Sequence, residues 1–339
     1  MLKGHHNTNY VLRVGLLPAL VIGVMPYTRF KYRVPLKTVE VVPRIWPREA
    51  DVLEVVCRHL REVPRCLAVL GELGDRSLHR YRRGKALSER NPDGEIDEKL
   101  MREFAAFFVR TAQVPVGELP PPPADWPDDG DSDGFLRWLV DFTEQRVHHP
   151  NRDRFGDLFD AVGIPQDAMT AFKANHHGLT SRPFKLLHTD VHRANVVVRR
   201  GRIAVIDWEL AIYGDPLHDL ATHLVRTGYG KAQQDRMVEL WAQAMERAGC
   251  AELTAGLHQD LDTYLAFEYA QSVFPDVMRA ALDLRGDAEE RHFRAAAERV
   301  SRALGRAREP LRLVEVPDLE QIVEALRKWH SMSGSTAGS

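Results

Sequence analysis

The sequence lacks several features that would each define a class of protein. It contains only three cysteines in 339 residues, Cys57, Cys66 and Cys250, and no CxxC pair. Three thiols cannot all pair within one chain, so a disulfide-stapled scaffold is excluded and a reducing, cytoplasmic location is expected. The formal net charge is only -2. There is therefore no basic surface that would predict a nucleic-acid partner.

Apolar segments long enough to cross a membrane are missing as well. The apolar segment Val14–Met25 is shorter than the roughly 20 residues that a spanning helix needs. It follows Lys3 and Arg13, as the core of a signal peptide would, but it contains Pro18 and has no small-x-small cleavage site before Tyr27. We therefore expect buried structure in this segment and no membrane partner.

What remains is an ordinary globular composition, with 44% hydrophobic and 28% charged residues, in a chain long enough for two lobes. Alternating and short apolar runs predict strands over 30–34, 38–42, 66–70 and 77–81. Helical periodicity predicts helices over 47–60, 96–113, 135–147, 155–161, 166–174, 217–226, 233–248, 259–284, 288–307 and 319–330. The Ser- and Gly-rich residues 331–339 are expected to be a disordered tail.

The most informative stretch is His188–Asn195, followed twelve residues later by Asp207. Short apolar runs flank it, and Gly201 marks a turn, so the pattern predicts strand, loop, strand, tight turn, strand. Asp190 and Asn195 then share one loop, and Asp207 ends the neighbouring strand. Oxygen ligands of this kind suit Mg²⁺, and a free carboxylate can accept the proton of an attacking hydroxyl. These are the parts that phosphoryl transfer needs.

The motifs in His188–Asn195, Ile206–Glu209 and Gly214–Asp219 are His-x-Asp-x4-Asn, Ile-Asp-Trp-Glu and Gly-Asp-Pro-x2-Asp. Together they resemble the aminoglycoside phosphotransferase (APH) family of small-molecule kinases. Protein kinases would carry Asp-Phe-Gly in place of Asp-Trp-Glu. The resemblance implies an α+β, two-lobed protein-kinase-like fold. Its small β-rich N-lobe would span residues 1–84 and its larger, mainly helical C-lobe residues 85–330.

The resemblance also implies an activity and a set of roles. The γ-phosphate of ATP would pass to a hydroxyl of a small molecule, such as an aminoglycoside, an amino alcohol or a sugar. Asp190 would accept or orient the hydroxyl proton, and His188 would shape the loop. Asn195 and Asp207 would bind Mg²⁺. The acceptor and the oligomeric state are not specified by these motifs.

Glycine is scarce where a kinase-like fold lays backbone amides over the ATP phosphates. The loop that leads into the first alternating run contains a single glycine, Gly4, with Asn7 as its neighbouring small polar residue. Only three residues precede Gly4, so the first strand of such a lobe would have no room before this loop. Adenine is expected on the hinge backbone around Tyr81.

By the same resemblance, a Lys at the end of the third strand should hold the α- and β-phosphates and pair with a Glu on the next helix. Arg44 takes that place in the predicted layout, with Glu49 as its partner, and Arg is a good phosphate ligand. Lys31 is the other candidate. The alternative is a solvated Arg and a Glu that merely favours a helix N-terminus.

Two other functions compete with the kinase hypothesis. One is a nucleotide- or ligand-binding pseudokinase with little activity, which the single glycine and Arg44 favour. The other is a metal-dependent hydrolase that uses His188 and His192. Late helical residues could also face an acceptor, or form ordinary surface ion pairs; the candidates are Glu268, Asp276 and Arg279.

Overall fold

The computed structural model describes residues 2–3, 7–13, 15, 29–35, 41–70, 76–176, 178–284 and 286–336. Gly4 and all of Val14–Met25 except Gly15 lie outside these ranges. Proximity divides the chain into two compact units. Unit 1 comprises Met1–Val39, Arg44–Ser132 and Ser181–Leu257, and unit 2 comprises Glu40–Pro43, Asp133–Thr180 and His258–Ser339. The boundary near residue 84 stays a prediction.

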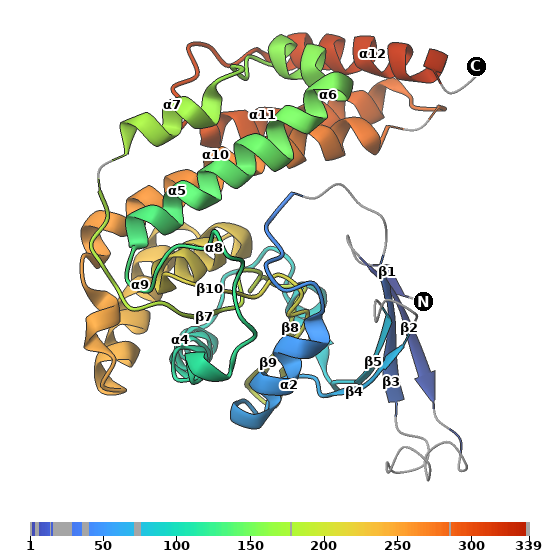
Figure 1. The fold of residues 1–339 in the computed structure, drawn as a ribbon. Helices are drawn as coiled ribbons and strands as arrows, with labels where there is room; N and C mark the ends of the chain where they lie inside the picture. Colours follow the sequence, from blue (N-terminus) through green and yellow to red (C-terminus); the bar gives the residue numbers. More distant parts are fainter. Residues whose placement is uncertain are drawn as a thin grey trace. The chain divides into compact units, whose positions relative to one another are not determined.

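Unit 1 contains a five-stranded antiparallel sheet with the strand order β1-β2-β3-β5-β4 (Figure 1). Its strands are β1 (Leu2–Lys3), β2 (Asn7–Arg13), β3 (Arg29–Pro35), β4 (Cys66–Leu70) and β5 (Arg76–Arg80). The strands predicted over 30–34, 66–70 and 77–81 are confirmed. The strand predicted over 38–42 is wrong at Val41 and Val42, which are not in a strand. Pro43 follows them and has no N–H to give to a ladder.

The first described helix of unit 1 is α2 (Glu49–His59). Acidic Glu49 and Asp51 lie in its first turn, and Arg58 and His59 lie in its last, which complements the helix dipole at both ends. Its buried face consists of Val52, Leu53, Val55 and Val56. The helix predicted over 47–60 is confirmed to within two residues at each end.

Two small sheets carry the predicted strand-loop-strand. β6 (Lys85–Ala86), β8 (Val196–Arg199) and β9 (Arg202–Val205) form one, and β7 (Lys185–Leu187) pairs with β10 (Ile212–Gly214) in the other. Arg200 and Gly201 join β8 to β9 with φ angles of 51° and 74°. Positive φ at both positions is what a tight two-residue hairpin requires. The predicted strands and turn are therefore confirmed.

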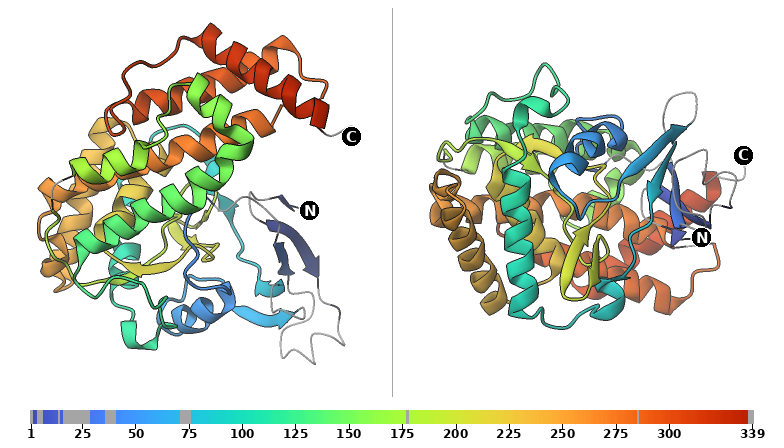
Figure 2. Two further views of the ribbon diagram at one scale, coloured as in Figure 1. Left: turned by 45° about the horizontal axis from the view of Figure 1, so that its top comes forward. Right: turned by 90° about the horizontal axis from the view of Figure 1, so that it is seen from below.

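The remaining helical elements of unit 1 are α3 (Leu87–Arg90), α4 (Glu98–Ala112), the 3₁₀ turns η1 (Val116–Glu118) and η3 (Ala251–Thr254), α8 (Pro216–Thr227) and α9 (Lys231–Arg247). The carboxylate of Asp97 caps α4 by accepting from the backbone N–H of Leu100 at 2.9 Å. Helix α4 lies beside α9 (Figure 2).

Unit 2 is helical. Its elements are α5 (Ser132–Phe142), the π turn η2 (Thr143–His148), α6 (His149–Ala161), α7 (Ala168–Asn175), α10 (Leu257–Leu282), α11 (Glu290–Ala307) and α12 (Leu319–Thr336). The helices predicted over 135–147 and 155–161 prove to be parts of one run from 132 to 161, which the π turn interrupts. None of the helices within the described ranges is long and apolar enough to cross a membrane.

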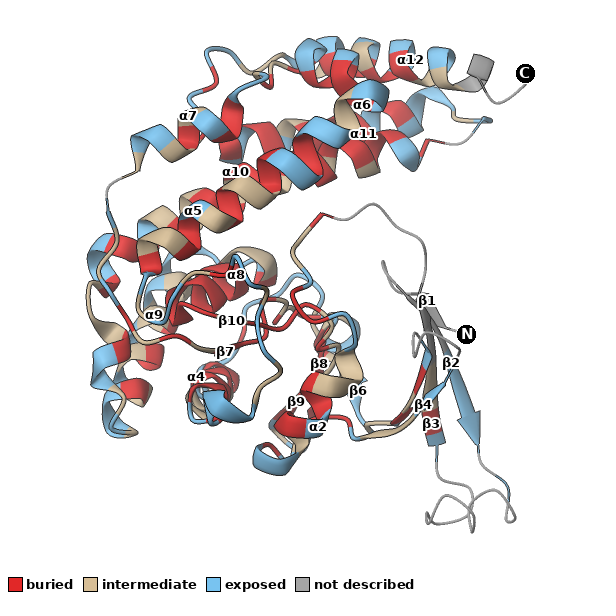
Figure 3. Cartoon of the chain, viewed as in Figure 1, coloured by how far each residue is buried: buried red, intermediate tan, exposed pale blue. Residues whose placement is uncertain are grey.

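Helix α12 corrects the prediction for the C-terminus. It has buried and exposed sides along its length (Figure 3). It continues to Thr336, six residues into the segment expected to be a disordered tail. The Ser331 hydroxyl donates to the carbonyl of Lys328 at 2.8 Å and so satisfies a carbonyl in the last turns. A serine-rich composition is therefore compatible with helix at this point.

Candidate active site

The loop between β7 and β8 brings two of the predicted residues into contact. The carboxamide nitrogen of Asn195 donates to Asp190 twice, to its carboxylate Oδ2 at 2.7 Å and to its backbone carbonyl at 3.1 Å. Both bonds use the nitrogen, so the carboxamide oxygen of Asn195 is left as its ligand atom. This arrangement orients the amide and places the Asp190 carboxylate beside it.

Asp207 follows β9 with a φ of 71°, in the left-handed region that non-glycine residues seldom adopt. Thr189, in the loop between β7 and β8, has a φ of 56°. Such conformations cost on the order of 1–3 kcal/mol each and cluster at functional sites. The hydroxyl of Thr189 donates to the Leu210 carbonyl at 2.6 Å, which helps to hold the conformation.

Asn195 and Asp207 line the same pocket, whose volume is about 300 Å³. All of its walls come from unit 1: β3, the start of α2, the segment after β5, β6 and β8. The lining residues that the sequence analysis had named are Lys31, Glu49, Tyr81, Asn195 and Asp207. The structure therefore gathers these five around one cavity, whereas Asp190 is not among the lining residues and contacts Asn195.

Gly84 also lines the pocket, although it was not among the site residues predicted from the sequence. Its φ is +152°, and an added Cβ would lie 2.4 Å from Cγ1 of Val197 and 3.0 Å from the carbonyl oxygen of Val198. Real Cβ atoms do not approach that closely, so glycine is required here for a close approach of two backbones. In the sequence, Gly84 follows an arginine pair and stands three positions before Leu87.

Arg44 is not where the sequence analysis placed it. It follows the end of β3 by nine residues and forms an ion pair with Glu209 at 2.7 Å. The expected partner, Glu49, instead accepts from the backbone N–H of Trp208 at 2.7 Å. Lys31, the second candidate, lies on β3 opposite His79 and lines the pocket with Glu49. Lys31 lies on the strand β3, whereas Val41 and Val42, just before Arg44, are not in a strand, which explains the misplacement.

The other predicted nucleotide-binding residues are less informative. Asn7 begins β2, and Gly4 lies outside the described residues. Tyr81 follows β5, and its backbone N–H donates to the Arg29 carbonyl at 3.1 Å. That amide is therefore occupied, and a hinge contact to adenine would fall to a neighbouring residue.

Helix α8 anchors the loop between β7 and β8 through hydrogen bonds. Asp219, in its first turn, accepts from the backbone N–H groups of His188 at 3.0 Å and Thr189 at 2.8 Å. Burial raises the pKa of the Asp219 carboxyl to about 6, although the two backbone hydrogen bonds oppose the rise. From the last turn of α8, the carbonyl of Thr227 accepts from Nε of Arg193 at 2.8 Å. The loop is thus fixed at both of its ends to one helix.

The start of α8 is itself anchored. The Asp215 carboxylate caps the helix by accepting from the backbone N–H of Leu217 at 3.0 Å, and Pro216 fits the first helical position. Arg182 donates to Asp215 through Nε and Nη2, at 2.6 to 3.1 Å, and both side chains are fully buried. This bidentate pair was not predicted; it explains why an acid stands before the proline.

Arg226, also on α8 and also missed, donates to Oδ1 of Asp190 at 2.7 Å. Nε2 of His192 lies 3.4 Å from Oδ2 of the same carboxylate. Burial by itself would raise the pKa of Asp190, but His192 and the positive Arg226 more than offset this, and the net pKa is lowered. Asp190 is therefore a carboxylate at neutral pH and a weak base, better suited to orienting a hydroxyl than to removing its proton early.

The two histidines of the loop make local contacts to its backbone. His188 is fully buried, and its Nδ1 accepts from the backbone N–H of Asp190 at 3.3 Å. Burial lowers the pKa of His188 to about 4. Nδ1 of His192 accepts from the backbone N–H of Ala194 at 3.2 Å. Within the described ranges, neither histidine belongs to a three-residue set with metal-ligand spacing, so the hydrolase hypothesis gains no support.

The acceptor candidates belong to α10 in unit 2. Asp276 and Arg279 form an ion pair 4.0 Å apart, with each side chain 43% exposed, as ordinary surface pairs do. Glu268 is buried and accepts from Nε2 of Gln271 at 2.7 Å. None of these contacts distinguishes an acceptor site.

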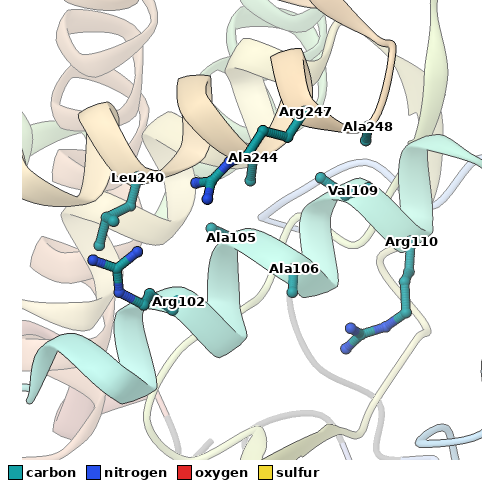
Figure 4. A pocket seen from close by; sticks show the side chains of 9 residues that line it. All are labelled: Arg102, Ala105, Ala106, Val109, Arg110, Leu240, Ala244, Arg247 and Ala248. Carbon is teal, nitrogen blue, oxygen red and sulfur yellow. The ribbon is translucent and has the colours of Figure 1, made fainter.

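A second pocket, of about 450 Å³, lies between α4 and α9 (Figure 4). Alanines, Val109 and Leu240 form its apolar surface, and the side chains of Arg102, Arg110 and Arg247 stand around it. It contains none of the residues predicted for phosphoryl transfer.

The donor set of the first pocket fits a magnesium ion. Mg²⁺ prefers oxygen ligands and is usually bound by one or two protein groups together with substrate phosphates. The Asn195 amide nitrogen is occupied by Asp190, so the group offers its oxygen, and Asp207 offers a carboxylate to the same cavity.

Comparisons with known proteins agree with this geometry. The family model for the phosphotransferase enzyme family (APH) matches residues 7–264. No curated protein matches the sequence. A thermostable mutant of aminoglycoside phosphotransferase APH(4)-Ia, solved with ADP and hygromycin B, is similar in structure, with a TM-score of 0.52 at 15% identity over 92% of each chain. The choline kinase LicA from Streptococcus pneumoniae gives 0.51 at 13% identity, over 91% of this chain and 92% of the other.

These likenesses confirm the α+β fold with a small antiparallel sheet and a mostly helical remainder. The family match covers well over half of the sequence and includes every motif of the candidate site. The chain belongs to the phosphotransferase enzyme family.

Proposed function

We propose that the protein transfers the γ-phosphate of ATP to a hydroxyl group of a small molecule, with Mg²⁺ as cofactor. One observation carries the proposal. The carboxamide of Asn195 and the carboxylate of Asp207 line one pocket with Lys31 and Glu49, and Asp190 is hydrogen-bonded to that same carboxamide.

In the proposed complex, Asn195 and Asp207 hold the metal ion, which neutralises charge on the transferring phosphates. Lys31 is the phosphate-binding cation, because it lies on β3 at the pocket wall and Arg44 is engaged by Glu209. Adenine contacts the hinge segment after Tyr81. The free state of all three cysteines is compatible with the cytoplasmic location that we propose.

The acceptor oxygen forms a bond to the γ-phosphorus as the bond from that phosphorus to the bridging oxygen of ADP breaks. Asp190 orients the hydroxyl and receives its proton late, which is consistent with its lowered pKa. Arg226 and Asn195 fix the carboxylate for this task. Most of the rate enhancement then comes from positioning and charge neutralisation.

The test is ATP consumption by the purified protein, screened against hydroxylated amines, sugars and aminoglycosides with and without Mg²⁺. Once an acceptor is found, Asp190→Asn should lower kcat by about a hundredfold or more with nucleotide affinity retained. Asp207→Asn should abolish Mg²⁺-dependent nucleotide binding. Asp235→Asn, in an exposed ion pair with Lys231 on α9, is the matched control and should change neither. Equal loss of nucleotide binding in the first two variants would contradict the assigned roles.

A second candidate is a nucleotide-binding protein without turnover. The ion pair of Arg226 with Asp190 favours it. The guanidinium lies 2.7 Å from the carboxylate and balances its negative charge, so the carboxylate accepts a proton less readily. A thermal shift with ATP and Mg²⁺ but no consumption with any acceptor would support this function. No shift with either ligand would refute both candidates.

A further inference from the structure

A candidate metal site, separate from the nucleotide pocket, lies in unit 2 at the π turn that joins α5 to α6. Glu144, His148 and His149 each offer a ligand atom there, and these atoms all lie within 4.8 Å of one another. Within the part of the chain that the structure describes, no other set of three histidine, cysteine or acidic residues meets this condition. None of the three residues takes part in the proposed phosphoryl transfer.

The π turn is what brings the three side chains together. In an α-helix, with 3.6 residues per turn, position i+5 lies roughly 140° around the axis from position i. A π turn bonds i to i+5 and so brings positions i, i+4 and i+5 to one side. The backbone N–H of His149 donates to the carbonyl of Glu144, which is this bond. Such turns are rare and frequently mark functional sites.

The spacing of the ligand atoms matches that of a tetrahedral ion. Oε1 of Glu144 lies 2.8 Å from Nε2 of His149 and 3.5 Å from Nδ1 of His148. Ligands bound at about 2.0–2.1 Å to a tetrahedral zinc ion lie roughly 3.3 Å apart. These two separations lie on either side of that value, so an ion would need only small side-chain movements.

Burial supplies an independent indication of a ligand. The side chain of His148 is fully buried and that of Glu144 is 8% exposed. Nδ1 of His148 and Oε2 of Glu144 are both buried without a hydrogen-bond partner. Leaving such atoms unsatisfied costs about 1–3 kcal/mol each. A cation held by Oε1 of Glu144 and Nδ1 of His148 would satisfy that nitrogen and draw the carboxylate into its shell.

The surroundings fix one histidine and leave the other accessible. The ring of His148 packs against Phe274, with ring centroids 4.6 Å apart, and against Phe159 at 5.8 Å. His149, in contrast, is 55% exposed. A preformed buried pair of ligands with one exposed ligand gives an ion a route from solvent, and it leaves a fourth position for water.

We propose that Glu144, His148 and His149 bind one divalent transition-metal ion of the zinc class, with water as the fourth ligand. Two histidines and one glutamate form a ligand set that zinc commonly takes. Mg²⁺ is excluded as the preferred occupant, because imidazole suits zinc and its neighbours, whereas Mg²⁺ prefers oxygen.

Arg152 provides a specific check on the atom assignment. Its Nη1 lies 3.3 Å from Nε2 of His148, and its Nη2 donates to Asp160 at 2.8 Å. A metal on Nδ1 of His148 leaves the proton on Nε2, facing the guanidinium, so Arg152 must turn towards Asp160 when the ion binds. Arg152→Met removes the positive charge that faces the ring and should therefore strengthen metal binding, by about tenfold, a size typical of changes to groups that contact a metal ligand.

The experiment is calorimetric titration of the untagged, full-length protein with Zn²⁺, together with visible spectra after addition of Co²⁺. We expect one ion per chain and the intense absorption of tetrahedral Co²⁺. Glu144→Gln and His149→Ala should lower the affinity on the order of a hundredfold or more, with unchanged far-UV circular dichroism. His258→Ala, an exposed histidine on α10, is the matched control and should bind as the parent does.

Three results would overturn the proposal. The first is the absence of stoichiometric zinc binding by the parent protein. The second is equal affinity in His149→Ala and His258→Ala, which would indicate scattered surface binding. The third is Arg152→Met binding no tighter than the parent, which would remove Nδ1 of His148 as a ligand. All of these readouts are independent of phosphotransferase activity.

Discussion

The buried ion pair of Arg182 with Asp215 should be one of the most sensitive points in unit 1. Both side chains are fully buried, and Arg182 also donates through Nη1 to the Ala255 carbonyl at 2.7 Å. Removing one partner of such a pair leaves a buried charge and costs about 3–5 kcal/mol. That is a large part of the roughly 5–15 kcal/mol that holds a domain folded.

The perturbation is Arg182→Met, which keeps the length of the side chain and removes the charge. Asp215→Asn is its counterpart, because asparagine can still cap α8 and so isolates the loss of charge. Urea unfolding should show each single variant destabilised by about 3–5 kcal/mol. The double variant should be less destabilised than the sum of the two, by about 1–3 kcal/mol.

The control is Arg294→Met, which breaks an exposed ion pair with Glu320 in which the side chains are 49% and 68% exposed. Exposed pairs contribute only about 0–1 kcal/mol. If Arg182→Met cost no more than Arg294→Met, or if the Arg182 and Asp215 effects were additive to within about 0.5 kcal/mol, the reasoning from burial would be refuted.

Three further predictions concern the nucleotide pocket and pH. Lys31→Met should raise the KM for ATP at least about tenfold, whereas Arg44→Met should change it little. Steady-state kinetics measure both values. A larger increase in KM for Arg44→Met than for Lys31→Met would restore Arg44 as the phosphate ligand. Gly84→Ala should raise the KM for ATP and lower the free energy of unfolding by about 1–3 kcal/mol, because its Cβ would clash with β8; parent-like values would contradict the close approach. Acidification from pH 7 to 4.5 should lower the urea midpoint, and a constant midpoint would contradict it. The reason is that burial lowers the pKa of three histidines from 6.5 to between about 3 and 4, so the unfolded chain binds more protons in that window; the raised pKa of Asp219 opposes them as a single group. These histidines are His188, His218 and His223.

The parts of the site that were predictable from the sequence are those built from neighbouring residues. The contact of Asn195 with Asp190 and the turn at Gly201 lie within one short segment, so spacing and apolar pattern were sufficient.

What could not be predicted depends on pairing between distant segments. Lys31 was ranked behind Arg44 because the third strand was assigned by local alternation, whereas its register is set by pairing with β5. Arg182 and Asp215 are 33 residues apart, and Gly84 meets β8 across more than a hundred positions. Neither contact leaves a trace in local composition. The π turn was also missed, because a single shift in hydrogen bonding does not change the apolar pattern around it.

The attachment of the loop to α8 has a consequence for how the site opens. The amides of His188 and Thr189 are bonded to a side-chain carboxylate and not to a neighbouring strand. Their protection against hydrogen–deuterium exchange should therefore follow the fraying of one helix. Asp190, held by Arg226 of the same helix, would lose its orientation in the same event. Under the proposed function, the fraying of α8 would then abolish activity in one cooperative step. This step would precede the unfolding of the two small sheets, β6-β8-β9 and β7-β10.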